Sequence, residues 1–133
     1  DRDMMPNTCL VTGNTSHVDG EGIVWNGRFE STISPHRLRR VNHITVPSVL
    51  DETKEWVRTA RKTYDVVDPE IGRIGAMAFR SGFDFDFLHI VSDNLVKPHR
   101  EGLHNERVTS VVSRRAKLFE AASSLLHDAI ERG

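Results

Sequence analysis

Apolar and polar residues follow a regular order of strand-like and helix-like segments from residue 41 onward. Short apolar runs rich in β-branched residues predict strands at residues 41–46, 64–67 and 88–91. Apolar residues spaced three and four positions apart predict helices at about residues 48–62, 69–81 and 106–131. This β-α-β-α-β-α order predicts an α/β fold, with a mostly parallel or mixed sheet and helices on its faces.

Capping residues and glycines add detail to the first two helices. Ser48 can cap the first helix, and Asp68, which precedes Pro69, can cap the second. Within the second helix, Gly72 and Gly75 each lower the helix propensity by about 1 kcal/mol. Glycines at these positions indicate that another backbone or a ligand comes very close.

The first third of the chain is less regular. Residues 23–33 are expected to form a hairpin with its turn at Asn26-Gly27, a pair that suits a type I′ turn. We therefore divide the chain into an irregular strand and hairpin region at residues 1–40, which joins the sheet, and a β-α-β-α-β-α portion at residues 41–133. Both regions belong to a single domain.

The overall composition is that of an ordinary globular protein, with 38% hydrophobic and 28% charged residues. The formal net charge is −1, so we expect neither nucleic acid nor an anionic membrane surface as a partner. No apolar run approaches the ~18 residues of a membrane-spanning helix. Cys9 is the single cysteine, which favours a reducing compartment and a cytoplasmic location.

Two acidic residues follow the ends of neighbouring predicted strands. Glu70 comes after the strand at 64–67, and Asp93 comes after the strand at 88–91. Because ligands bind outside the carboxyl ends of parallel strands, both carboxyl groups are expected at one rim of the sheet. A buried carboxylic acid can protonate a leaving group, and a carboxylate can accept hydrogen bonds from two ribose hydroxyls. Each residue also has a structural alternative: Glu70 can compensate the helix dipole, and Asp93 can form an Asx turn.

Other candidate sites carry weaker signals. His99 and His104 flank Arg100-Glu101 without the spacing of a zinc site, so we predict no metal. His89, on the strand predicted at residues 88–91, is expected to point into the hydrophobic core. No Gly-x-Ser-x-Gly segment marks a serine hydrolase.

Three short motifs in the second half of the chain occur in a characteristic order. They are Val67-Asp68-Pro69-Glu70, an Ala- and Gly-rich helix ending in Ser81-Gly82, and the run Leu88-His89-Ile90-Val91-Ser92-Asp93-Asn94. Together they resemble the C-terminal half of the family of purine and uridine nucleoside phosphorylases and nucleosidases. In that family an acidic-Met-Glu motif starts a helix, and the next strand ends in Ser-Asp. The resemblance covers residues 41–131, with Pro69 at the place of the family's methionine.

The resemblance implies a role for each matching residue. Asp93 would hydrogen-bond the purine N7 and protonate it as the glycosidic bond breaks, while Ser92 would orient Asp93. Glu70 would bind the ribose 2′ and 3′ hydroxyls. Further contacts with the substrate are implied for Val46, Asp68, Pro69 and Asn94.

The implied activity is cleavage of the N-glycosidic bond of a purine nucleoside or a nucleoside-like metabolite. Phosphate or water would capture the ribosyl centre, so phosphate would be a co-substrate in the first case, and no cofactor is expected. The family's N-terminal half, which holds the phosphate, has no counterpart in this sequence. We therefore expect a second chain that carries it, or a homo-oligomer. The alternative is a non-catalytic scaffold or regulatory subunit that keeps the same fold.

Overall fold

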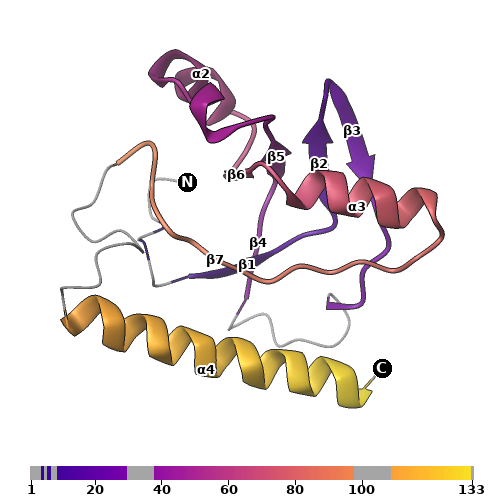
Figure 1. The fold of residues 1–133 in the computed structure, drawn as a ribbon, viewed down its shortest axis with the longest axis vertical. Coiled ribbons are helices and arrows are strands. Elements are labelled where there is room, and N and C mark those ends of the chain that lie inside the picture. The colour runs from indigo at the N-terminus through magenta and orange to yellow at the C-terminus, as the bar shows by residue number, and fades with distance from the viewer. Residues whose placement is uncertain (1–3, 5, 7–8, 30–37, 98–108, 133) are drawn as a thin grey trace.

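The computed structural model describes residues 4, 6, 9–29, 38–97 and 109–132, which form an α/β fold (Figure 1). Their strands make a four-stranded sheet in the order β3-β2-β5-β6 and a three-stranded sheet in the order β4-β1-β7. The four-stranded sheet consists of β2 (Thr15–Val18), β3 (Glu21–Val24), β5 (His43–Thr45) and β6 (Val66–Asp68). The three-stranded sheet consists of β1 (Leu10–Thr12), β4 (Arg39–Arg40) and β7 (His89–Ile90). The predicted α/β class is confirmed.

The four-stranded sheet is parallel through its centre. Strand β5 pairs in parallel with β2 on one side and with β6 on the other, while β3 adds an antiparallel edge strand. The register pairs Thr45 with Asp68. Because side chains alternate between the two faces of a sheet, His43 lies on the same face as Asp68, two positions along the neighbouring strand.

Helix α3 (Ile71–Arg80) packs on this sheet through its glycines. A Cβ atom on Gly72 would collide with the side chain of Ser16 on β2, and one on Gly75 would lie 2.6 Å from the ring of Trp25. Real Cβ atoms do not approach other atoms that closely, so these positions require glycine for α3 to lie where it does. The close neighbour that the glycines predicted is therefore the protein's own sheet and Trp25.

Strand β7 differs from its prediction. The sequence predicts a buried parallel strand at residues 88–91, whereas β7 runs antiparallel to β1 and the His89 side chain is 48% exposed. The reason lies upstream, where the chain turns back after Gly82, whose φ is 73°. The Phe85 N–H then donates to the carbonyl of Asn26, so the segment runs beside the N-terminal region and reaches β1 from the opposite direction.

The hairpin lies earlier in the chain than its prediction. Strands β2 and β3 are joined by Asp19 and Gly20, whose φ angles of 49° and 89° are both positive, as a type I′ turn requires. The prediction of a turn at residues 26–27 is wrong, because the Asp86 carboxylate accepts the backbone N–H of Arg28 and holds this segment against the chain that follows α3. The second arm of the predicted hairpin extends into residues outside the described part.

The helix predicted at residues 48–62 is divided in two. Its first part is the 3₁₀ helix η1 (Val49–Asp51), and its second part is α2 (Lys54–Ala60). Ser48 caps η1 in a capping box, and the Thr53 side chain caps α2. Two capping residues so close together each start a new helix, which is why the chain does not continue as one.

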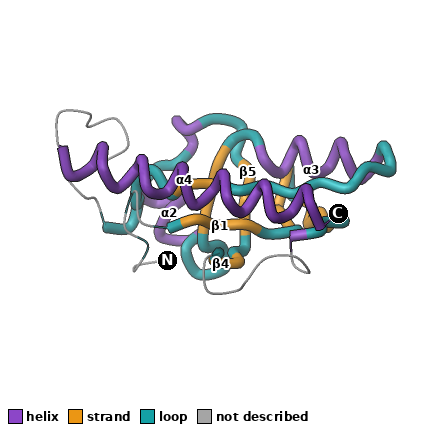
Figure 2. Tube along the Cα trace, turned by 90° about the horizontal axis from the view of Figure 1, so that it is seen from below, coloured by secondary structure: helices purple, strands orange, loops and turns teal. Residues whose placement is uncertain are grey.

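Helix α4 (Thr109–Arg132) confirms the last predicted helix over its described length. It runs beside the three-stranded sheet, on the side away from α3 (Figures 1 and 2). Val111 and Leu125 are buried, whereas Phe119 and Ile130 remain largely exposed. None of the described helices is both long enough and apolar enough to cross a membrane.

The main hydrophobic core joins the two sheets. Its buried side chains come from β1, α3 and the segments beside them, and they are Met4, Val11, Trp25, Val41, Ile71 and Phe87. The Trp25 and Phe87 rings are tilted with their centroids 6.3 Å apart. The core therefore fixes the position of the segment that leads from α3 into β7.

Candidate functional site

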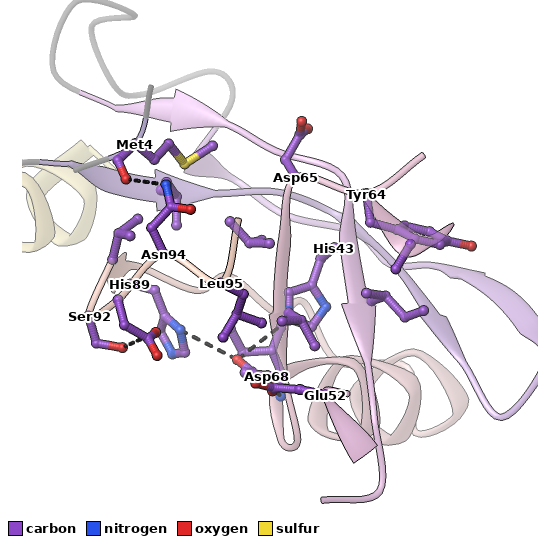
Figure 3. Close-up of a pocket in the computed structure, with 18 of the residues that line it drawn as sticks. Met4, His43, Glu52, Tyr64, Asp65, Asp68, His89, Ser92, Asn94 and Leu95 are labelled. Atoms are coloured by element: carbon purple, nitrogen blue, oxygen red, sulfur yellow. Dashed lines mark hydrogen bonds and ion pairs between the residues drawn. The ribbon is translucent and has the colours of Figure 1, made fainter. Parts of the chain in front are cut away.

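A cavity of about 610 Å³ lies where the ends of β6 and β7 meet the η1–α2 segment (Figure 3). This volume is within the range of small-molecule sites in proteins, which is roughly 300–1,000 Å³. Apolar side chains from both sheets and from α2 line much of it, among them Val11, Trp56, Val57, Val66, Ile71 and Phe87. Ionisable and hydroxyl side chains also line it, among them His43, Glu52, Asp68, His89, Ser92 and Asp93.

Asp68 is the most connected of the polar residues. Its Oδ1 accepts the backbone N–H groups of Glu70 and Ile71, at 2.6 and 2.7 Å, and so holds the start of α3, although the N-cap position is Glu70 and not Asp68 as predicted. Its Oδ2 lies 3.5 Å from Nε2 of His43 and 3.4 Å from Nδ1 of His89 (Figure 3). One carboxylate therefore starts a helix with one oxygen and faces two imidazole rings with the other.

The environment of Asp68 favours its charged form. Burial alone raises the pKa of the Asp68 carboxyl, because it removes water from the negative charge. The contact with His43 and the donated backbone N–H groups outweigh this effect. The pKa of Asp68 therefore lies below its usual 3.8, and the residue carries a negative charge at neutral pH.

The two histidines on Asp68 have different surroundings. The His43 side chain is 1% exposed, and its Nδ1 lies 2.9 Å from the Ser16 hydroxyl. The His89 side chain is 48% exposed and faces the cavity. His43 thus belongs to the interior of the four-stranded sheet, whereas His89 is accessible to a ligand.

His89 stays neutral at pH 7. Burial is the largest effect on its pKa and lowers it, and the neighbouring His43 lowers it too. The negative charges of Asp68 and Glu70 act in the opposite direction but do not compensate. The pKa of His89 therefore lies below its usual 6.5. Because Asp68 Oδ2 lies nearest to Nδ1, its negative charge favours the tautomer with the proton on Nδ1 and the lone pair on Nε2.

Ser92 and Asp93 lie in the loop that follows β7. The Ser92 hydroxyl donates to Oδ1 of Asp93 at 3.2 Å, and both residues are exposed at the cavity. Across the cavity, burial raises the pKa of the Glu52 carboxyl above its usual 4.5, and the negative charges of Asp93 and Asp68 raise it further. Two carboxylates on the other side of the cavity thus act on Glu52.

The structure brings five of the seven sequence-predicted site residues to this cavity: Asp68, Pro69, Ser92, Asp93 and Asn94. Glu70 is exposed at the start of α3, and its charge acts on His89, but it is not among the described lining residues. Val46 is 4% exposed and packs in the interior, also outside the described lining. We expected Glu70 and Asp93 at one rim of the sheet. In the structure it is Asp68, and not Glu70, that lines the same cavity as Asp93.

Asn94 has a structural task within the loop. Its side-chain N–H donates to the carbonyl of Met4, and its Oδ1 accepts the backbone N–H groups of Val96 and Lys97. The Asx-type turn that the sequence offered as an alternative for Asp93 is therefore formed by the next residue. Asp93 is left with the Ser92 hydroxyl and faces the cavity.

His43, His89 and Glu52 were not predicted as parts of the site. For His43, the signal is present in the parallel register, which places it on the same face as Asp68. For His89, the prediction that it points into the core is wrong, because β7 is an edge strand next to β1. Glu52 reaches the cavity only because the chain bends between η1 and α2, which no periodicity predicts.

The charge around the cavity is mostly negative. Arg61 is the only arginine or lysine among the described residues that line it, against Glu52, Asp65, Asp68 and Asp93. The described part of the chain contains no group of three or more His, Cys, Asp or Glu side chains that could hold a metal ion. His99 and His104 lie outside the described residues.

The chain matches no protein-family model, and no curated protein matches it.

Proposed function

We propose that this cavity binds a purine nucleoside or a nucleoside-like metabolite and that the protein cleaves its N-glycosidic bond. The observation that carries the proposal is the Ser92–Asp93 hydrogen bond at a cavity of about 610 Å³ with largely apolar walls. An apolar cavity with a few convergent polar groups is typical of small-molecule sites. Trp56 and Phe87 offer apolar and aromatic surface to a flat heterocycle.

The chemistry assigned to Asp93 follows from the leaving group. A purine leaves poorly as an anion, so a proton delivered to N7 lowers the barrier while the ribosyl carbon becomes cationic. The carboxyl of Asp93 delivers this proton, and the electron pair of the broken bond stays on the base. The Ser92 hydroxyl fixes the orientation of the carboxyl. Pro69 lines the cavity just before α3 and contacts the ribose, and the exposed Glu70 beside it would have to turn toward the cavity to bind the ribose hydroxyls.

The same residues support membership of the nucleoside phosphorylase and nucleosidase family as part of the proposal. Asp68-Pro69-Glu70 leads into an Ala- and Gly-rich helix, and Ser92-Asp93 follows a strand, which is the order that the family resemblance requires. We assign the reaction to the cytoplasm, where nucleosides are metabolised in a reducing environment.

A partner chain is the second element of the proposal. The outer face of α3 and the turn that follows it expose Ile74, Met77, Phe79 and Phe83, each by more than half of its surface. Exposed apolar groups of this size indicate a contact with another chain. The partner is either a chain that completes the phosphorylase-like domain or a second copy of this one.

Release of free base tests the proposed activity. The protein, with any chain that co-purifies, is incubated with inosine, adenosine and methylthioadenosine, with and without phosphate. Release of base above the rate of buffer alone is expected for at least one substrate. Absence of release from all three, at protein concentrations that saturate each nucleoside, would contradict the assignment.

The exposed apolar face of α3 also favours one alternative, a non-catalytic scaffold or regulatory subunit that keeps the nucleoside pocket. Calorimetric titration identifies a nucleoside that the protein binds, and an assay for free base then separates the two functions. An enzyme releases base from the nucleoside that it binds. A scaffold binds the nucleoside and leaves the glycosidic bond intact.

A further inference from the structure

The contact between Asp68 and His89 places a carboxylate next to one ring nitrogen of a histidine that lines the cavity. Asp68 Oδ2 lies 3.4 Å from His89 Nδ1, and the negative charge of Asp68 favours a proton on that nitrogen. The other ring nitrogen, Nε2, then carries the lone pair. Since the His89 side chain is half exposed and lines the cavity, a water molecule can reach it.

Asp68 is itself held firmly in this position. Its Oδ1 is fixed by two backbone N–H groups at the start of α3, and its Oδ2 also faces the buried ring of His43. The Ser16 hydroxyl lies 2.9 Å from the other nitrogen of His43 and fixes that ring in turn. A carboxylate anchored on a helix end and on a buried ring loses little freedom when it orients a base.

We propose that His89, oriented by Asp68, is the base that activates a water molecule, so that the glycosidic bond is cleaved by hydrolysis. This inference rests on the proposed function and names its nucleophile. His89 Nε2 takes a proton from the water, whose oxygen forms a bond to the ribosyl C1′. The bond from C1′ to the base breaks, its electron pair stays on the base, and Asp93 supplies the proton to N7.

The products of this step are the free base and ribose, with His89 left protonated and Asp93 left ionised. One proton passes from His89 to Asp93 through solvent and restores the starting state. Asp68 keeps its charge throughout and stabilises the imidazolium as it forms. Asp68 is therefore a positioning residue, as is His43 behind it.

The charges around the cavity favour water over phosphate as the nucleophile. Phosphate is anionic, and the described lining residues offer it Arg61 against four acidic side chains. The negative charges of the lining carboxylates raise the free energy of binding phosphate, whereas a neutral water molecule meets no such repulsion. Hydrolysis therefore needs no phosphate-binding half, and the activity of this site does not depend on one.

The base predicts an acid limb in the rate. The charged groups that face His89 are Asp68 on β6, His43 on β5 and Glu70 before α3. Because the pKa of His89 lies below 6.5, the ring is active at neutral pH and loses its lone pair as the pH falls through that lowered value. The rate should therefore fall in mildly acidic solution as His89 takes up a proton.

Two substitutions of His89 test the inference. In His89→Asn, the amide N–H occupies the place of Nδ1–H and can still donate to Asp68, but no base remains. We expect base release to fall by about 10²–10⁴-fold and the acid limb to disappear. In His89→Gly, added imidazole should restore part of the lost rate, which a merely structural role would not allow. In ¹⁸O-labelled water, wild-type protein should produce ribose that carries one label.

The outcomes separate this inference from the function on which it rests. If wild-type protein releases base only with phosphate and yields ribose 1-phosphate, or if His89→Asn keeps the wild-type rate and pH profile, the proposed function stands and the role of His89 is wrong. If wild-type protein releases no base from any substrate, the proposed function fails and the role of His89 fails with it. Circular dichroism of each variant checks that the fold is retained.

Discussion

The two sheets of this protein were specified by the sequence to different degrees. In the four-stranded sheet, the parallel strands β5 and β6 follow one another along the chain, with the η1–α2 connection between them. In the three-stranded sheet, the central strand β1 pairs with β4 and β7, which are distant in sequence and run in different directions. Hydrophobic periodicity predicted the parallel order of β5 and β6 correctly. It predicted the direction of β7 incorrectly, because periodicity carries no information about strand partners that are distant in sequence.

The site lies where these two regions meet. Asp68 ends β6 of the four-stranded sheet, and it faces His43 from the same sheet and His89 from the other. The buried contact, Asp68 with His43, lies within the four-stranded sheet, which the local sequence pattern predicts. The accessible contact, Asp68 with His89, reaches the three-stranded sheet, which the pattern does not predict. A site of this kind combines a rigid half, which holds the carboxylate, with a half that presents the reactive ring.

The largest effect on stability is expected at Trp25, which is 1% exposed in the core next to α3. Trp25→Ala removes a large buried ring and should lower the free energy of unfolding by about 3–5 kcal/mol. Phe119→Ala on α4, where the ring is 56% exposed, should cost less than about 1 kcal/mol. Urea denaturation measures both. Equal losses would mean that the Phe119 ring is packed as tightly as the Trp25 ring, which their exposures contradict.

A smaller effect is expected at Gly72, where α3 touches β2. The added methyl group of Gly72→Ala meets the Ser16 side chain and should destabilise the protein by about 1–3 kcal/mol. Gly22→Ala on the edge strand β3 is the matched control, because nothing lies within 4 Å of its Cβ position. The same denaturation experiment compares the two. A neutral Gly72→Ala would show that α3 does not lie on the sheet at this distance.

The smallest effect on stability is expected at Glu52, and it depends on pH. The pKa of Glu52 is raised in the folded protein, so its contribution is fully present below pH 4.5 and is lost as the pH rises through the raised value. Its ionised form therefore opposes folding at pH 7. Glu52→Gln should raise the melting temperature slightly at pH 7 and leave it unchanged at pH 4.

A control for this experiment is Glu21→Gln on β3, which lies away from the cavity. It should change the melting temperature little at either pH. An increase for Glu52→Gln that is the same at both pH values would mean that the pKa of Glu52 is not raised in the folded protein.

Local chemistry determined the parts of the fold that could be predicted. The Asp68 carboxylate accepts the backbone N–H groups at the start of α3, which depends on neighbours in sequence, although the helix begins two residues later than predicted. Gly72 and Gly75 indicated a close contact, but only the pairing of β2 with β5 reveals that the contact is with the sheet and Trp25. The hairpin was placed wrongly because Asn26-Gly27 and Asp19-Gly20 are both good turn sequences, and tertiary contacts with Asp86 decide between them.

The same distinction applies to the candidate site. Ser92 and Asp93 could be predicted because they follow a strand end, where ligands bind in α/β proteins, and Asp68 because the family resemblance implied it. His89 and Glu52 could not, since His89 depends on the antiparallel partner of β7 and Glu52 on the bend between η1 and α2. Residues that reach a site through a distant pairing or a change of chain direction leave no periodic signal.

The assignment of Asp93 is tested most directly by base release from a nucleoside that the wild-type protein cleaves, measured with Asp93→Asn beside it. Asp19→Asn is the matched control, because Asp19 lies in the β2–β3 turn outside the described lining of the cavity. The account predicts that Asp93→Asn keeps its fold and loses base release by about 10²–10⁴-fold, while Asp19→Asn retains the wild-type rate. A wild-type rate for Asp93→Asn would contradict the central claim that this carboxyl protonates the leaving base.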